Sequence, residues 1–147
     1  MKVLDVIGSR ADVYSIEGDA TVHDAARYLR ERQVRAAGVL DAKGALVGVV
    51  SQSDISDKVA AENKCPAWMR VTEIMSTDLV TVTPDQPVAD CLRLMEQNGI
   101  YHLLVVDASG RFRGMLSVTD ILTVIASDEK SRADMLEAFL FERTQMP

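Results

Sequence analysis

GVVSQSDI at residues 48–55 and GMLSVTDI at residues 114–121 are two versions of one short segment. The likeness extends outward from it, so that residues 13–55 align with residues 79–121 at a constant shift of 66 positions and without a gap. One copy of about 60 residues buries little surface by itself, which favours packing of the two copies on each other. We therefore expect the function to lie on the surface between the copies.

Each copy begins with the pattern of a strand followed by a helix. The first strands are expected at residues 13–16 and 79–82, which are short and rich in β-forming residues. The helices that follow are expected to begin near Thr21 and near Pro87. Both carry apolar residues at the spacing i, i+3, i+4 and i+7, which predicts one buried helix face.

Two apolar strands and a second helix complete each copy. Gly44 and Gly110 fit the left-handed position of the short hairpin loop that joins these strands. The near-continuous apolar runs predict central strands that are covered on both faces. The sequence thus predicts an α+β protein in which two β-α-β-β-α motifs pack through their sheets with pseudo-two-fold symmetry.

The expected domain boundaries follow from the repeat. They are residues 1–64 for the first motif, 65–70 for a linker, 71–128 for the second motif and 129–147 for a C-terminal tail. The tail has apolar residues at helical spacing and predicts an amphipathic helix. Trp68, the only tryptophan, is expected to pack over the edge of the core.

Bulk composition argues against several classes of function. A net charge of −6 on 147 residues disfavours broad binding to nucleic acid or to an anionic membrane. No apolar run approaches the roughly 20 residues of a membrane span, and the N-terminus lacks the apolar region of a signal peptide. Cys65 and Cys91 have no CxxC partner or metal-type spacing, so we expect a cytoplasmic protein without a metal site.

The repeated ending, Gly-x-x-Ser-x-Ser/Thr-Asp, is the best candidate for chemistry. It lies where a strand ends and a helix begins, and a helix N-terminus offers unpaired N–H groups to a phosphate. The hydroxyls can add donors, and the carboxylate can accept hydrogen bonds from a vicinal diol such as a ribose. The candidate residues are Ser51, Ser53 and Asp54 in the first copy and Ser117, Thr119 and Asp120 in the second. The same spacing also fits a capping box, and the two interpretations are compatible.

A family resemblance rests on several of these segments in order. They are the lead-in at residues 74–76, the strand and turn at 79–85, the strand end at 105–107 and the two Gly-x-x-Ser-x-Ser/Thr-Asp endings. In this duplicated order, the chain resembles a tandem pair of cystathionine β-synthase domains, the CBS pair, over about residues 1–128.

The resemblance implies two clefts between the motifs that bind adenosine-containing ligands: AMP, ADP, ATP, S-adenosylmethionine or NAD-type dinucleotides. The first implied set is Ser51, Ser53, Asp54, Ser76, Leu79, Val80 and His102. The second is Ser117, Thr119, Asp120, Ser9, Val13, Tyr14 and Arg35. The aspartates would hold the ribose and the first-strand residues the base. Arg35 and His102 either contact phosphate or are ordinary surface side chains.

The implied function is a regulatory module that senses an adenosyl ligand and signals to an enzyme or transporter. The ligand would be regulatory, so no obligatory cofactor is expected. No P-loop, HExxH or GxGxxG motif is present, and we expect no catalytic activity. The main alternative is a structural dimerisation and docking protein with empty clefts. A single-stranded nucleic acid binder is a further alternative that the acidic charge disfavours.

A homodimer is also expected. The helices after Asp54 and Asp120 and the tail carry several apolar residues. They are Val59, Ala60, Leu122, Val124, Ile125, Phe139 and Phe141. These are more apolar side chains than one sheet face can cover. Because members of the resembled family commonly dimerise through these second helices, we expect a second copy of the chain to cover the excess.

Overall fold

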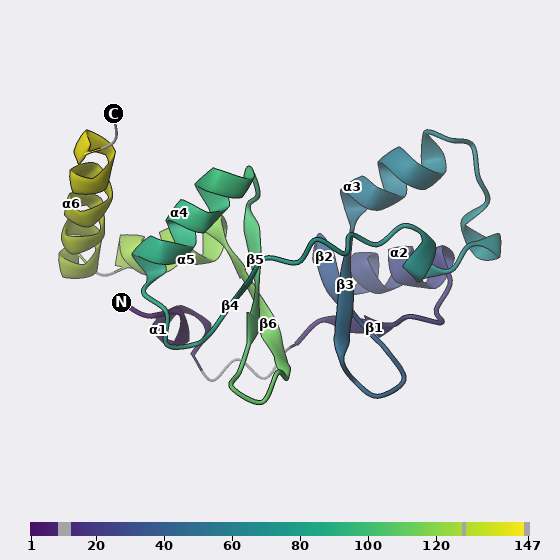
Figure 1. Cartoon of the computed structure of the whole chain (residues 1–147). Helices are drawn as coiled ribbons and strands as arrows, with labels where there is room; N and C mark the ends of the chain where they lie inside the picture. Colours follow the sequence, from purple (N-terminus) through teal and green to yellow (C-terminus); the bar gives the residue numbers. More distant parts are fainter. Residues whose placement is uncertain (9–12, 128, 146–147) are drawn as a thin grey trace. The chain divides into compact units, whose positions relative to one another are not determined.

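The computed structural model describes residues 1–8, 13–127 and 129–145 and contains two three-stranded sheets (Figure 1). In the first sheet the strand order is β1 (Ser15–Glu17), β2 (Ala36–Leu40) and β3 (Leu46–Ser51). In the second it is β4 (Thr81–Val82), β5 (His102–Val106) and β6 (Phe112–Ser117). The pairs β1–β2 and β4–β5 are parallel, and β2–β3 is antiparallel. The expected α+β class is confirmed.

Helices connect and follow these strands. The α-helices of the described residues are α1 (Val3–Ile7), α2 (Val22–Arg32), α3 (Gln52–Ile55), α4 (Val88–Asn98), α5 (Val118–Ser127) and α6 (Glu129–Gln145). The described residues also form three single turns: the π-helical η1 (Ser56–Ala60) and the 3₁₀ turns η2 (Pro66–Trp68) and η3 (Val71–Glu73). Among the described residues, no helix is both long enough and apolar enough to traverse a lipid bilayer.

The parallel strand pairs need a crossover, and α2 and α4 provide it in the two copies. Thr21 caps α2, because its hydroxyl accepts the backbone N–H of Asp24 at 3.1 Å. Pro87 immediately precedes α4. Each helix buries the apolar face that its sequence predicts, with Val22 and Val88 fully buried at matching positions. The hairpin glycines Gly44 and Gly110 have φ of 82° and 79°, as the loop requires.

The chain divides into two compact units that exchange their lead-in segments. Unit 1 comprises Met1–Ala11, Val80–Asp107 and Met115–Pro147, and unit 2 comprises Asp12–Leu79 and Ala108–Gly114. The lead-in before the first repeat is therefore part of the unit that holds the second repeat, and the lead-in before the second repeat is part of the unit that holds the first. Neither unit is one continuous stretch of sequence.

Backbone hydrogen bonds hold both lead-ins in place. In unit 1, Val3 N–H donates to the carbonyl of Gln86 at 2.9 Å. In unit 2, Val71 N–H donates to the carbonyl of Ala20 at 2.9 Å. Val3 and Val71 are both fully buried and belong to the cores of these units. Each core is consequently completed by a segment from a distant part of the sequence.

The structure corrects the expectation for Trp68. Its side chain was expected over the core edge, yet Trp68 is 86% exposed. It lies in η2, a single 3₁₀ turn that begins at Pro66 and is too short to present separate core and solvent faces. Met69, the next residue, is only partly exposed and packs against the core of unit 2 instead.

The C-terminal helix has a buried side and an exposed side. Met135 is buried in the core of unit 1. Leu136, Leu140 and Phe141 are exposed, at 53%, 59% and 62% of their surface. The predicted helix is therefore present, but only part of its apolar surface is covered within the chain.

The two cysteines should differ in reactivity. Cys65 is exposed, whereas Cys91 is fully buried in α4, and this burial raises the pKa of the Cys91 thiol from 9.0 to about 11. Because the folded-state pKa is raised, the Cys91 thiol should contribute stability below pH 9 that is lost between about pH 9 and 11.

At pH 8 a thiol-specific reagent should label Cys65 quickly in the native protein and should label Cys91 only in denaturant.

Titration of native protein and of Cys65→Ser with a chromogenic disulfide reagent checks this expectation. The variant should show no fast reaction. Rapid labelling of both cysteines in the native wild-type protein would contradict the buried position of Cys91.

Candidate functional site

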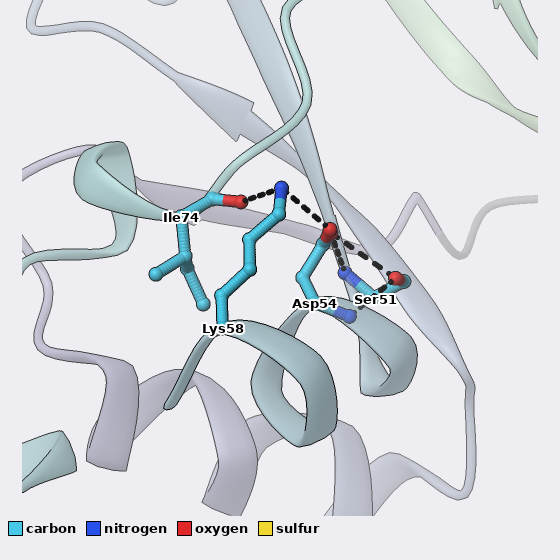
Figure 2. Close-up of polar contacts among 4 residues, drawn as sticks. All are labelled: Ser51, Asp54, Lys58 and Ile74. Atoms are coloured by element: carbon cyan, nitrogen blue, oxygen red, sulfur yellow. Dashed lines mark hydrogen bonds and ion pairs between the residues drawn. The ribbon is translucent and has the colours of Figure 1, made fainter. Parts of the chain in front are cut away.

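The carboxylate of Asp54 lies at the start of α3 and is held by its own turn (Figure 2). Its Oδ2 accepts hydrogen bonds from the backbone N–H of Ser51 at 2.9 Å and from the Ser51 hydroxyl at 3.1 Å. The Ser51 Oγ in turn accepts the N–H of Asp54 at 3.2 Å. Asp54 is only 8% exposed, and among the residues that the structure describes it is the only charged residue that is buried.

The second copy repeats this arrangement at the start of α5. The N–H of Ser117 donates to Oδ2 of Asp120 at 3.0 Å, and the N–H of Asp120 donates to Oγ of Ser117 at 3.0 Å. Asp120 is partly exposed. The capping interpretation therefore holds in both copies, and it fixes the direction of each carboxylate at a helix N-terminus.

Lys58 forms an ion pair with Asp54, and the sequence analysis did not identify this residue. Its Nζ lies 3.0 Å from Oδ1 of Asp54 and donates a hydrogen bond to the carbonyl of Ile74 at 2.8 Å. The signal was present in the sequence, since an acidic and a basic residue at i and i+4 are neighbours on a helix. The corresponding position of the second copy is Val124.

The residues just before β2 and β5 contact the first residues of α3 and α5 through backbone hydrogen bonds. The carbonyl of Arg35 accepts the N–H of Gln52 at 2.9 Å, and the carbonyl of Tyr101 accepts the N–H of Val118 at 3.1 Å. Arg35 and His102 are both exposed. Arg35, which the resemblance groups with Asp120, thus has a backbone contact to the helix that carries Asp54.

The other candidates divide between the two units. Ser76 pairs with Val49 of β3, donating to its carbonyl at 2.8 Å and accepting its N–H at 3.0 Å. The residues of unit 2 are Ser51, Ser53, Asp54, Ser76, Leu79, Val13, Tyr14 and Arg35. Those of unit 1 are Ser117, Thr119, Asp120, Val80 and His102. Ser9 lies outside the described residues. The grouping into two sets stays a prediction.

The side chains available for ligand contact differ in exposure. Ser53 and Thr119 are exposed, whereas Ser51, Ser76 and Ser117 are partly exposed. Leu79, Val80, Val13 and Tyr14 are also partly exposed. Within the described part of the chain, no group of three His, Cys, Asp or Glu side chains could hold a metal ion.

Comparison with known families gives two matches to the CBS domain, over residues 3–61 and 71–127. The chain belongs to the CBS domain family. An uncharacterized protein of Methanocaldococcus jannaschii is 30% identical over 115 residues, which cover 78% of this chain and 37% of that protein. The chain spans less than two thirds of the length of such curated relatives.

Solved CBS structures share the fold. A putative signal-transduction protein with CBS domains from Burkholderia ambifaria is 26% identical, with a TM-score of 0.80 over 87% of this chain and 96% of that chain. The CBS domain pair of protein MJ0100, in complex with 5′-methylthioadenosine and S-adenosyl-L-methionine, is 26% identical, with a TM-score of 0.74 over 84% of this chain and 98% of that chain. A hexameric CBS-CP12 protein from bloom-forming cyanobacteria is 33% identical, with a TM-score of 0.72 over 83% of this chain and 69% of that chain.

The cap at Asp54 should contribute measurably to stability. Ser51→Ala removes the hydroxyl that accepts the N–H of Asp54 and donates to its carboxylate. We expect the free energy of unfolding to fall by about 1 kcal/mol, the usual loss for such a cap. Urea unfolding followed by circular dichroism measures this loss. Ser53→Ala, at an exposed position on the same helix, is the control and should change the free energy of unfolding by less than about 0.5 kcal/mol. Equal effects would contradict the cap.

Proposed function

We propose that the chain is a regulatory module that binds an adenosine-containing ligand through ribose hydroxyls at Asp54 and Asp120. The repeated Ser-Asp geometry is the observation that carries this proposal, because it fixes one carboxylate at each helix start. The remaining members of each set, including His102 and Arg35 as phosphate contacts, belong to the proposal as well. We assign no catalytic step to these residues.

A carboxylate at a helix N-terminus suits a sugar diol. Its oxygens accept hydrogen bonds, and a bond to a charged acceptor is worth roughly 1.5–3 kcal/mol. The partial positive charge of the same helix start also favours a phosphate nearby. A nucleotide presents both groups in one molecule, so one helix start can bind two parts of it.

The class of ligand is supported by the solved relatives. The CBS pair of protein MJ0100 was solved with 5′-methylthioadenosine and S-adenosyl-L-methionine, and it is 26% identical to this chain. AMP, ADP, ATP, S-adenosylmethionine and NAD-type dinucleotides remain the candidates. Signalling requires that the ligand bind two arrangements of the protein with different affinity. The regulated partner would be an enzyme or a transporter.

Ligand binding is tested by thermal unfolding with AMP, ATP, NAD or S-adenosylmethionine. A ligand that binds the native state should raise the melting temperature, and a concentration of 100 times Kd is worth roughly 2.7 kcal/mol. Asp54→Ala and Asp120→Ala should each reduce the rise. Asp57→Ala, which removes an exposed carboxylate one turn from Asp54, is the matched control and should keep it.

Two outcomes would overturn the proposal in different ways. Absence of a rise with every ligand would favour the alternative, a structural dimerisation and docking protein. A rise that survives unchanged in both Asp54→Ala and Asp120→Ala would place the ligand elsewhere.

We also propose a homodimer, and exposed apolar surface in unit 1 supports it. A groove of about 760 Å³ lies among α4, α5 and α6, and its lining includes Met95, Leu122, Leu136 and Phe139. Leu122 is 58% exposed. A second copy of the chain would cover this surface. Val59 and Ile125, which the sequence suggested for the same contact, are only 2% and 8% exposed and already belong to the cores of their own units.

Light scattering should return about twice the chain mass of 16.1 kDa. Leu122→Glu should shift the mass toward that of the monomer, because it places a charge in an apolar contact. Ala42→Glu adds the same charge at an exposed hairpin position and should leave the mass unchanged. A monomeric wild-type protein would contradict the dimer.

A further inference from the structure

Lys58 joins the candidate ligand site to a segment that leads toward the second repeat (Figure 2). Its ammonium group lies between Oδ1 of Asp54, at 3.0 Å, and the carbonyl of Ile74, at 2.8 Å. The Lys58 side chain is 47% exposed, so it has room to leave this position. One cation therefore connects the carboxylate with residues 71–76, which we call the coupling segment.

The coupling segment is packed against unit 2 along its length. Val71 and Ile74 are 0% and 2% exposed, and Ser76 pairs with Val49 of β3. A Cβ atom at Gly48 would lie 2.4 Å from Sδ of Met75 and 3.1 Å from the carbonyl oxygen of Ser76, so the segment approaches β3 as closely as a glycine permits. Movement of this segment must therefore break specific contacts.

The connection belongs to one copy of the repeat. Val124 stands in α5 where Lys58 stands in the first copy, and a valine carries no charge. The local backbone differs too, since Lys58 lies in the π-helical turn η1, whereas α5 is a regular α-helix. Such π-helical turns are often found at functional sites.

A count of acceptor sites shows why a sugar would disturb Lys58. An ionised carboxylate offers about four lone-pair sites. At Asp54 three are used, by the Ser51 N–H, the Ser51 hydroxyl and Lys58. A ribose diol donates two hydrogen bonds, so about one site is lacking. Lys58, on a long and partly exposed side chain, is the donor that can move away while the cap stays intact.

We propose that Lys58 is a positioning residue that couples sugar binding at Asp54 to the coupling segment. In the ligand-free protein it restrains the carboxylate and the Ile74 carbonyl together. A bound ribose takes its place at Oδ1, and the carbonyl of Ile74 loses its partner. Binding at one helix start thereby loosens the segment between the repeats. This inference rests on the proposed function and adds a route by which binding is transmitted.

The restraint is tested first without ligand, by hydrogen exchange of the amides of Met75 and Ser76. These donate to the carbonyls of Val71, at 3.0 Å, and Val49, at 2.8 Å. Lys58→Met should speed their exchange by about twofold to fivefold, the range for a partly exposed ion pair. Lys58→Arg should restore the slow rate. Lys64→Met, at a nearby exposed lysine, is the control and should match the wild type.

The coupling is tested next with AMP and with S-adenosylmethionine, using amides of β2 as the internal reference. In the wild type, binding should speed the exchange of Met75 and Ser76. In Lys58→Met, the same ligand should still raise the melting temperature but should leave their exchange unchanged. If the ligand raises the melting temperature and changes the exchange of Met75 and Ser76 by the same factor in the wild type and in Lys58→Met, the coupling is wrong but the proposed function stands. Absence of any rise in the wild type would overturn the proposed function and the coupling with it.

Discussion

A carboxylate that leaves water at the start of a helix must be matched by donors, because an unpaired buried charge is strongly unfavourable. At Asp54 the match is local: the N–H and hydroxyl of Ser51 bind one oxygen, and Lys58 binds the other. Since the two Ser51 donors come from the turn that carries Asp54, a Ser-x-x-Asp sequence can form this cap where a strand passes into a helix. This is why the geometry recurs at Asp120 in a unit with different neighbouring side chains.

The second constraint is long-range. Each unit has its core completed by the lead-in that precedes the other repeat, with Val3 buried in unit 1 and Val71 in unit 2. The backbone partners of these residues, Gln86 and Ala20, are far away in sequence. Each lead-in adds buried apolar surface to a core that one repeat alone would leave incomplete. This suits repeats of about 60 residues, because short chains bury a small fraction of their surface. A signal that moves a lead-in therefore acts on a core as well as on a loop.

The local features were predictable from the sequence and the long-range ones were not. Helical spacing identified the buried faces of α2 and α4, and Gly44 and Gly110 identified the hairpins, because each depends on residues a few positions apart. The exposure of Trp68 depends on how the linker packs against residues distant in sequence, and no local pattern predicts such packing. The same holds for Val59, whose place in the core of unit 2 was mistaken for a contact with a second copy.

Duplication also explains why the repeated Ser-Asp pairs were singled out as candidates and Lys58 was not. Comparing the copies selects what they share, such as Ser51 with Ser117, and passes over what differs, such as Lys58 and Val124. The glycine of the repeated motif shows the same limit. Gly48 is favoured by the close approach of the Met75 side chain and the Ser76 carbonyl. Gly114 is favoured by its φ of 124°, and among the described residues other than its chain neighbours no atom lies within 4 Å of where its Cβ would stand. A shared letter thus has two physical causes, and a difference between the copies is where one helix start can acquire a property that the other lacks.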